Sequence, residues 1–176
     1  GTWIIREIES PKGYVLSEEE IAVTIGKVDE VVEIELVNYF IKGNIALTKV
    51  DEDYPDNKLS GAVFEVYSDT NGDGKLDKDD TLLGEMKELD GGVYQMSELR
   101  YGKYLVKETK APTGFVFDEN VYSVSVEENG KTYTVENKAG VGFINAAQKG
   151  SLKIVKTSSD GKVEGFSFRV TGVDYD

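Results

Sequence analysis

Gly43-Asn-Ile-Ala-Leu-Thr-Lys49 alternates apolar and polar side chains in the manner of a half-buried β-strand. Residues two apart share a face of a strand, so Lys49 falls on the apolar face with its neighbours Ile45 and Leu47. Tyr104-Leu-Val-Lys-Glu108 puts a glutamate on its apolar face in the same way, and Val141-Gly-Phe-Ile-Asn145 does so with an asparagine. The pattern therefore predicts three polar side chains that face one core.

Buried charges without partners cost several kcal/mol, so such groups pair or shift their pKa values toward the neutral form. A neutral lysine beside a carboxamide is a nucleophile beside an electrophile. The hypothesis is that Lys49 attacks the side chain of Asn145, Glu108 relays the proton, ammonia leaves and an intramolecular amide remains. The alternative is a hydrogen-bonded triad that does not react.

An internal repeat favours the reactive interpretation. The segment Asn38-Tyr-Phe-Ile-Lys-Gly43 matches Asn145-Ala-Ala-Gln-Lys-Gly150 at an offset of 107 residues, and a lysine follows each glycine at the same spacing. The motif Glu-x-x-x-Pro-x-Gly-aromatic also occurs twice. The counterparts are Glu7 for Glu108, Asn38 for Asn145 and Lys156 for Lys49.

The repeat is the size of a domain, so it predicts a tandem array. We expect residues 1–42 to be the C-terminal part of one unit, 43–149 a complete unit, and 150–176 the first strands of a third. The first segment then holds Glu7 and Asn38 without a lysine of its own, and the last holds Lys156 without an acid or amide. We expect residues 150–176 of one molecule to dock on residues 1–42 of another and to react there. The links between units are short, so we expect the array to be a stiff rod.

The fold class predicted is all-β, as tandem antiparallel sandwiches. Asn129-Gly130 suits a tight hairpin turn, and no segment has a convincing amphipathic helical pattern. Strands of the central unit are expected at 44–51, 61–68, 81–87, 93–97, 102–109, 119–127, 131–138 and 140–146.

The composition excludes several classes of function. The net charge is −13, from 33 acidic and 20 basic residues, which disfavours nucleic acid and anionic membranes as partners. No apolar stretch is long enough for membrane insertion. Cysteine and histidine are both absent and no nucleophile elbow occurs, so we expect no enzyme beyond one self-directed turnover. Without cysteine no disulfide can stabilise the units, and a Lys–Asn amide would take that role.

The order of these motifs resembles that of CnaB-type domains, also called SpaA-like or prealbumin-like domains, of Gram-positive adhesins and pilins. The matching elements are Gly43 to Lys49, Gly61-Ala-Val-Phe-Glu-Val66, and Leu99 to Phe115. The resemblance implies an inverse immunoglobulin-like sandwich, extracellular display on the cell wall by sortase, and an isopeptide bond between the first and last strands. It carries the reactive lysine onto Lys49, the reactive asparagine onto Asn145 and the catalytic acid onto Glu108.

A second motif predicts a metal site. Residues 69–80 fit a twelve-residue calcium loop, because oxygen donors recur at the spacing that Ca²⁺ uses and a glycine lies at the sixth position. An EF-hand would have glutamate at the last position, where this chain has aspartate with a second aspartate before it. The alternative is a solvated acidic turn. The predicted ligands are Asp69, Asn71, Asp73, the Lys75 carbonyl, Asp77 and Asp80, with Asp79 able to replace Asp80.

Two functions follow from these expectations. The first is a structural stalk or pilin-shaft module whose partners are neighbouring domains of the same chain. The alternative is an adhesive module that binds a host extracellular protein or glycan through its loops. An exposed aromatic patch or a long insertion would favour the second, and the calcium loop is the sole candidate for such an insertion.

Overall fold

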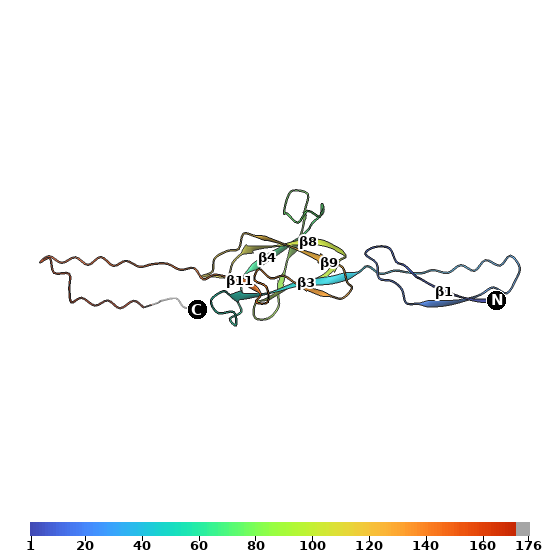
Figure 1. The fold of residues 1–176 in the computed structure, drawn as a ribbon, viewed down its shortest axis with the longest axis horizontal. Helices are drawn as coiled ribbons and strands as arrows, with labels where there is room; N and C mark the ends of the chain where they lie inside the picture. The colour runs from blue at the N-terminus through green and yellow to red at the C-terminus, as the bar shows by residue number, and fades with distance from the viewer. Residues whose placement is uncertain (172–176) are drawn as a thin grey trace.

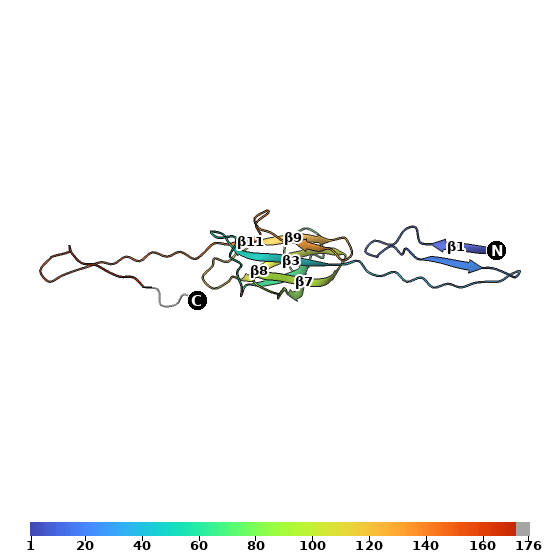
Figure 2. The ribbon, with the colours of Figure 1, turned by 90° about the horizontal axis from the view of Figure 1, so that it is seen from below.

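A computed structural model describes residues 1–171 and is all-β over that range. Figure 1 shows a central β-sandwich between a two-stranded N-terminal piece and an extended C-terminal segment. Figure 2, turned by 90°, shows the same order along the long axis. Among the described residues no helix could cross a membrane.

The sandwich consists of two sheets that pack face to face. One has the strand order β10-β3-β7-β6 with β11 also paired to β3, and the other has the order β5-β4-β8-β9. The strands are β3 (Lys42–Asp51), β4 (Val63–Ser68), β5 (Thr81–Glu85), β6 (Lys87–Glu88), β7 (Val93–Arg100), β8 (Gly102–Lys110), β9 (Val121–Val126), β10 (Thr132–Thr134) and β11 (Phe143–Asn145).

Strand β3 organises the first sheet, because it pairs with three others. It runs antiparallel to β7 and parallel to both β10 and β11. In the register with β11, Lys49 is opposite Phe143 and Asp51 is opposite Asn145. The first and last strands of the sandwich are therefore direct neighbours.

The core lies between the sheets and is formed by the faces that alternation predicts. Ring edges pack against ring faces there: the centroid of Phe143 lies 4.9 Å from that of Phe64 and 5.1 Å from that of Tyr122. The largest apolar side chains that are almost fully buried are Tyr94, Phe64, Phe143, Ile45, Leu47 and Leu105.

Gly142 allows β11 to lie close against β3. Its φ angle is +134°, and a Cβ atom there would lie 2.8 Å from the carbonyl oxygen of Thr48. Any other residue would push the two strands apart. This glycine therefore helps to place Asn145 beside the strand that carries Lys49.

Several predicted strands are shorter in the structure. Strand β10 covers only part of the expected 131–138, because Asn137 turns its side chain onto the backbone of Ile144 and the segment leaves the sheet. The expected strand at 81–87 is divided into β5 and β6, which belong to different sheets. Sequence alternation does not reveal such a crossover.

The N-terminal piece contains an antiparallel pair, β1 (Thr2–Arg6) and β2 (Glu20–Thr24). Residues 31–39 form no strand although their side chains alternate, and neither do residues 150–171. Both segments lack a neighbouring strand to pair with in this structure. Large apolar residues are exposed in both pieces, for example Trp3 at 61% and Leu152 at 72%.

Candidate functional site

The structure brings Lys49, Glu108 and Asn145 together inside the sandwich. Lys49 comes from β3 and Asn145 from β11 in one sheet, whereas Glu108 comes from β8 in the other. Their exposed fractions are 0%, 0% and 3%. The lysine Nζ lies 4.0 Å from Glu108 Oε1, and the amide Nδ2 of Asn145 lies 3.0 Å from Glu108 Oε2.

Lys49 lies in a largely apolar environment. Its Nζ is 5.1 Å from the centroid of the Phe143 ring and donates a hydrogen bond of 3.0 Å to the carbonyl oxygen of Phe143. Burial lowers the pKa of Lys49 to about 8, and the nearby charges of Glu108 and Asp118 limit that decrease. An appreciable part of the lysine is therefore a neutral amine near neutral pH.

The pKa of Glu108 lies above that of an ordinary surface glutamate. Burial raises the pKa of Glu108, while hydrogen bonds from Asn145 and from the backbone of Asp118 and the charge of Lys49 oppose the increase. The backbone N–H of Asp118 donates to Oε2 at 2.8 Å. Burial thus moves the amine and the acid toward their neutral forms together.

The orientation of the Asn145 amide follows from its neighbours. Nδ2 donates to the backbone carbonyl oxygen of Val116 at 2.5 Å, and a carbonyl can only accept. The nitrogen therefore faces Val116 and Glu108. The oxygen Oδ1 has no hydrogen-bond partner, and no other buried side-chain N or O atom in residues 1–171 shares that condition. The amide is held by its nitrogen alone, next to an acid.

A second layer of polar residues supports this triad, and sequence reasoning missed it. Asn137 holds β11 from the side: its Oδ1 accepts from the Ile144 N–H at 2.6 Å, and its Nδ2 donates to the Ile144 carbonyl at 2.9 Å. Nδ2 also donates to Asp118 Oδ2, which Tyr122 contacts through its hydroxyl. Burial alone would raise the pKa of Asp118, and hydrogen bonds from Asn137, Asn120 and Tyr122 outweigh it and lower the pKa.

The signal for this layer was weak in the sequence. Asp118 lies just before the strand expected at 119–127, where polar residues are ordinary. Asn137 lies within the strand expected at 131–138, two residues after Val135, and alternation alone does not show which side chain it would meet. Only the fold shows that Asn137 is next to the strand that carries Asn145, and that the N–H of Asp118 caps Glu108.

Comparison with known families identifies the fold of the central sandwich. The model of the SpaA prealbumin-like fold domain matches residues 43–139, which is more than half of the chain. The chain belongs to this family. The match lies within the central sandwich and contains Lys49 and Glu108, while Asn145 follows its end.

Solved structures give further relatives of this SpaA-like chain. The Bacillus anthracis TIE protein is 30% identical, with a TM-score of 0.66, and the match covers 84% of this chain and 25% of that one. BcpA, the major pilin subunit of Bacillus cereus, is 26% identical over 61% of this chain and 31% of its own, with a TM-score of 0.46. GBS52, the minor pilin of Streptococcus agalactiae, is 25% identical over 78% of this chain and 62% of its own, also with a TM-score of 0.46.

The chain thus spans less than two thirds of each of these relatives. A search of curated proteins finds no match.

The counterparts of the triad lie outside the SpaA-like sandwich, and two of the three contact each other. Glu7 and Asn38 meet in the N-terminal piece, where Nδ2 of Asn38 donates to both carboxylate oxygens of Glu7 at 2.8 Å. Lys156 lies in the C-terminal segment, with its Nζ 4.3 Å from the centroid of the Phe166 ring. The structure therefore joins the acid and the amide of this second set and leaves the lysine apart.

The predicted calcium ligands all lie in the loop between β4 and β5. Several of the loop's side chains accept hydrogen bonds from the loop backbone: Asp69 accepts from Gly72 and Gly74, and Asp80 from Thr70 and Asp77. In residues 1–171 no group of three acidic side chains converges in a metal-binding arrangement. The donor types suit Ca²⁺, but binding would require the carboxylates of the loop to converge on one point.

Proposed function

We propose that this chain is a structural module of a bacterial surface protein, stabilised by an amide that forms between Lys49 and Asn145 with Glu108 as the proton-transfer group. The observation that carries the proposal is the enclosure of all three side chains in one apolar core, with Glu108 in contact with both others. A buried amine, acid and amide enclosed together in one core are placed to react.

The reaction follows from the positions of the atoms. The neutral Nζ of Lys49 attacks Cγ of Asn145, the bond between Cγ and Nδ2 breaks, and Nδ2 leaves as ammonia with the proton that the lysine gives up. Glu108 is next to both nitrogens, so it can accept that proton from one and donate it to the other. The fold supplies the proximity that would otherwise require a bimolecular encounter.

The product would stabilise the domain in two ways. An amide between Lys49 and Asn145 closes a loop of 96 residues. By analogy with disulfides this constrains the unfolded chain and contributes about 4–5 kcal/mol. The bond would also link β3 and β11, the first and last strands of the sandwich along the chain, which are adjacent and parallel. Tension applied to the chain would then pass through covalent bonds.

These properties suit a stalk or pilin shaft displayed outside the cell. The relatives named as pilins support this setting, and attachment to the cell wall is part of the proposal. The adhesive alternative needs a binding surface on the sandwich. Three clefts lie on the N-terminal piece instead, at 6–8, 15–20 and 33–39.

Intact mass spectrometry of the 176-residue chain tests the proposal. We expect the wild-type monomer to be lighter than its calculated mass by one ammonia, and Lys49→Ala and Glu108→Gln to have their full calculated masses. Lys107→Ala is the matched control, because Lys107 precedes Glu108 on β8 with its side chain on the opposite face. Full mass in the wild type would refute the proposal.

We also propose that the loop at 69–80 binds Ca²⁺ as a structural ion. Support comes from the oxygen donors at the spacing of calcium loops and from Gly74, whose φ of +76° permits the tight turn. Asp69, Asn71, Asp73, Asp77, Asp80 and the Lys75 carbonyl would hold it. The ion would cross-link the loop that connects the two strands.

A further inference from the structure

Asp118 contacts both halves of the reactive site, through different atoms. Its backbone N–H donates to Glu108 Oε2 at 2.8 Å. Its Oδ2 accepts from Asn137 Nδ2 at 2.9 Å, and Asn137 in turn holds the backbone of Ile144, the residue before Asn145. One partly buried residue therefore contacts the proton-transfer group directly and the strand of the reactive amide through a single intermediate.

The carboxylate of Asp118 is held in its ionised form. Oδ2 also accepts from the Tyr122 hydroxyl at 2.8 Å, and Oδ1 accepts from the N–H and the side-chain Nδ2 of Asn120 at 2.9 and 2.7 Å. Burial raises the pKa of Asp118, and these hydrogen bonds, together with that from Asn137, lower it by more. The group is therefore a permanent negative charge at every pH where the lysine can lose its proton.

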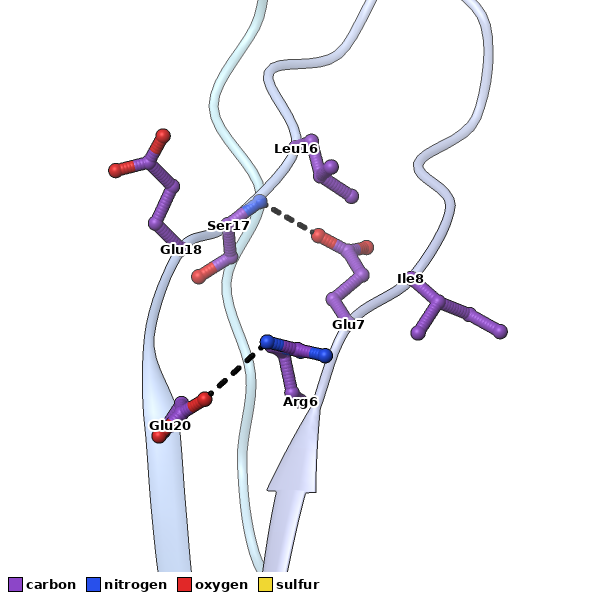
Figure 3. A pocket seen from close by; sticks show the side chains of 7 residues that line it. All are labelled: Arg6, Glu7, Ile8, Leu16, Ser17, Glu18 and Glu20. Carbon is purple, nitrogen blue, oxygen red and sulfur yellow. Dashed lines mark hydrogen bonds and ion pairs between the residues drawn. The ribbon is translucent and has the colours of Figure 1, made fainter.

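The N-terminal piece shows what a reactive site needs from this position. Ser17 corresponds to Asp118 at an offset of 101 residues, the same offset that relates Glu7 to Glu108 and the β1–β2 register to that of β8 and β9. Figure 3 shows the Ser17 N–H directed at the Glu7 carboxylate, and its hydrogen bond to Oε2 measures 2.7 Å. The serine hydroxyl also accepts from the N–H two residues on, as Asp118 Oδ1 does. A serine therefore supplies both the cap of the acid and the turn.

What the serine does not supply is a charge. Tyr122, which donates to the carboxylate, has Ile21 as its counterpart at the same offset, so the donor is missing where the anion is missing. Neither the cap nor the turn requires a carboxylate at position 118. The property that remains to be explained is its negative charge.

Three titratable groups face this charge. Burial lowers the pKa of Lys49, on β3, to about 8, and the charges of Glu108 and Asp118 limit the decrease. Burial raises the pKa of Glu108, on β8, and the charge of Asp118 adds to that increase. Burial and the hydrogen bond to Asp118 raise the pKa of Tyr122, on β9, to about 12, so its hydroxyl stays neutral. The other side chains that contact the carboxylate are amides, which carry no charge.

We propose that Asp118 is a positioning residue of the amide-forming site and that its fixed negative charge sets the pH range in which the amide forms. The inference rests on the proposed function, because it concerns the reaction of Lys49. That reaction requires a neutral amine and a protonated acid. An anion beside both groups keeps the lysine charged and Glu108 protonated up to a higher pH, so it displaces both limbs of the pH dependence upward.

The rate of ammonia loss as a function of pH tests this proposal in the 176-residue chain refolded from denaturant. Asp118→Asn and Asp118→Ser both remove the charge and keep the backbone N–H, and Ser17 shows that a serine is compatible with the cap. We expect both variants to form the amide, with the whole pH profile displaced to lower pH. Glu119→Gln is the matched control, because it removes an exposed negative charge from the next residue and should leave the profile unchanged.

Two results would overturn the proposal. A purely structural role of Asp118 would change the rate without moving the limbs, so profiles of Asp118→Asn and Asp118→Ser at the wild-type pH would contradict the role of the charge. An equal displacement in Glu119→Gln would show that the position of the charge beside the site is unimportant.

Titration of Lys49 by NMR separates this result from that of the proposed function. In Asn145→Ala no amide can form, so the pKa of the lysine amine can be measured in labelled protein with and without Asp118→Asn. We expect a lower pKa in the double variant. Equal values, in a protein whose wild type loses ammonia, would overturn the role of Asp118 and leave the proposed function intact. Full mass in the wild type would instead refute the proposed function, and a lower pKa in the double variant would then still support the action of Asp118 on Lys49.

Discussion

Lys49 shows how burial alone can turn a common residue into a nucleophile. Its ordinary pKa of 10.5 falls to about 8 because its charged form loses the solvation of water. The neutral fraction then grows about tenfold for each pH unit until about pH 8. The pKa of Glu108 is raised, so its protonated form is lost as the pH increases further.

We therefore expect a bell-shaped dependence of the rate of amide formation on pH, with the rising limb below about pH 8. The measurement is the loss of ammonia after protein purified in denaturant is diluted into buffers of different pH. Glu108→Gln should lower the rate by about 10²–10⁴ at every pH, because it removes the proton relay. A rate that does not change with pH would contradict this mechanism.

Asn137 is a positioning residue for Asn145. It satisfies both the N–H and the C=O of Ile144, the residue before the reactive asparagine. Removing it leaves these groups unpaired at a cost of about 1–3 kcal/mol, so Asn137→Ala should slow amide formation by about tenfold or more. Asn120→Ala is the control, because Asn120 contacts Asp118 from an exposed position.

The pH profile separates positioning from chemistry. In Asn137→Ala the rate should fall while the pH at half-maximal rate stays near that of the wild type, since the lysine and the acid are unchanged. Circular dichroism before the reaction checks that the variant is folded. An unchanged rate would show that β11 is held well enough by its pairing with β3.

At the scale of elements, melting temperatures can test whether the loop between β4 and β5 binds Ca²⁺. A ligand that binds only the folded state raises the stability by about 2.7 kcal/mol at one hundred times its dissociation constant. We expect a higher melting temperature in Ca²⁺ than in chelator for the wild type, and no difference for Asp73→Ala. Lys78→Ala leaves the donor set complete and should respond as the wild type does. Equal wild-type melting temperatures in the two buffers would exclude the ion.

At the scale of the whole molecule, the proposed amide determines how force passes along the chain. The chain enters the sandwich at the start of β3 and leaves it after β11. Lys49 and Asn145 lie on these two strands, so the loop of 96 residues between them would bear no load. In single-molecule pulling we expect the wild type to lack the extension of about 320–340 Å that unfolding of this loop would release. Lys49→Ala should show that extension, and its absence there as well would refute the force path.

The joint between the N-terminal piece and the sandwich is stiffened by specific contacts. The guanidinium of Arg100 lies 4.0 Å from the centroid of the Phe40 ring, and the Tyr101 N–H donates to the carbonyl of Ile41 at 2.9 Å. Gly13 packs on Tyr101 with a φ of +87°.

We expect Arg100→Ala to loosen this joint, because the guanidinium loses its ring partner. Faster proteolysis at residues 41–43, with the sandwich itself intact, would report the change. Lys110→Ala, on the next strand and away from the joint, is the control and should be cleaved at the wild-type rate. Equal rates for both variants would show that the backbone bonds alone hold the joint.

The all-β class, the faces of β3, β8 and β11, and the identity of the triad were all predictable from sequence. The reason is that strand alternation is local: Lys49 shares a face with Ile45 and Leu47 whatever the rest of the chain does. The recurrence of glutamate, asparagine and lysine at fixed offsets added a second signal that needs no coordinates.

Tertiary structure alone decided the contacts across the sandwich. That β11 pairs with β3, that Glu108 reaches both partners from the opposite sheet, and that Asn137 holds β11 all depend on chain crossings that a local pattern does not encode. Tertiary contacts also decide whether strands form in the N-terminal and C-terminal segments. Residues 150–171 have the alternation of strands and form none, because a strand exists only where another strand accepts its hydrogen bonds.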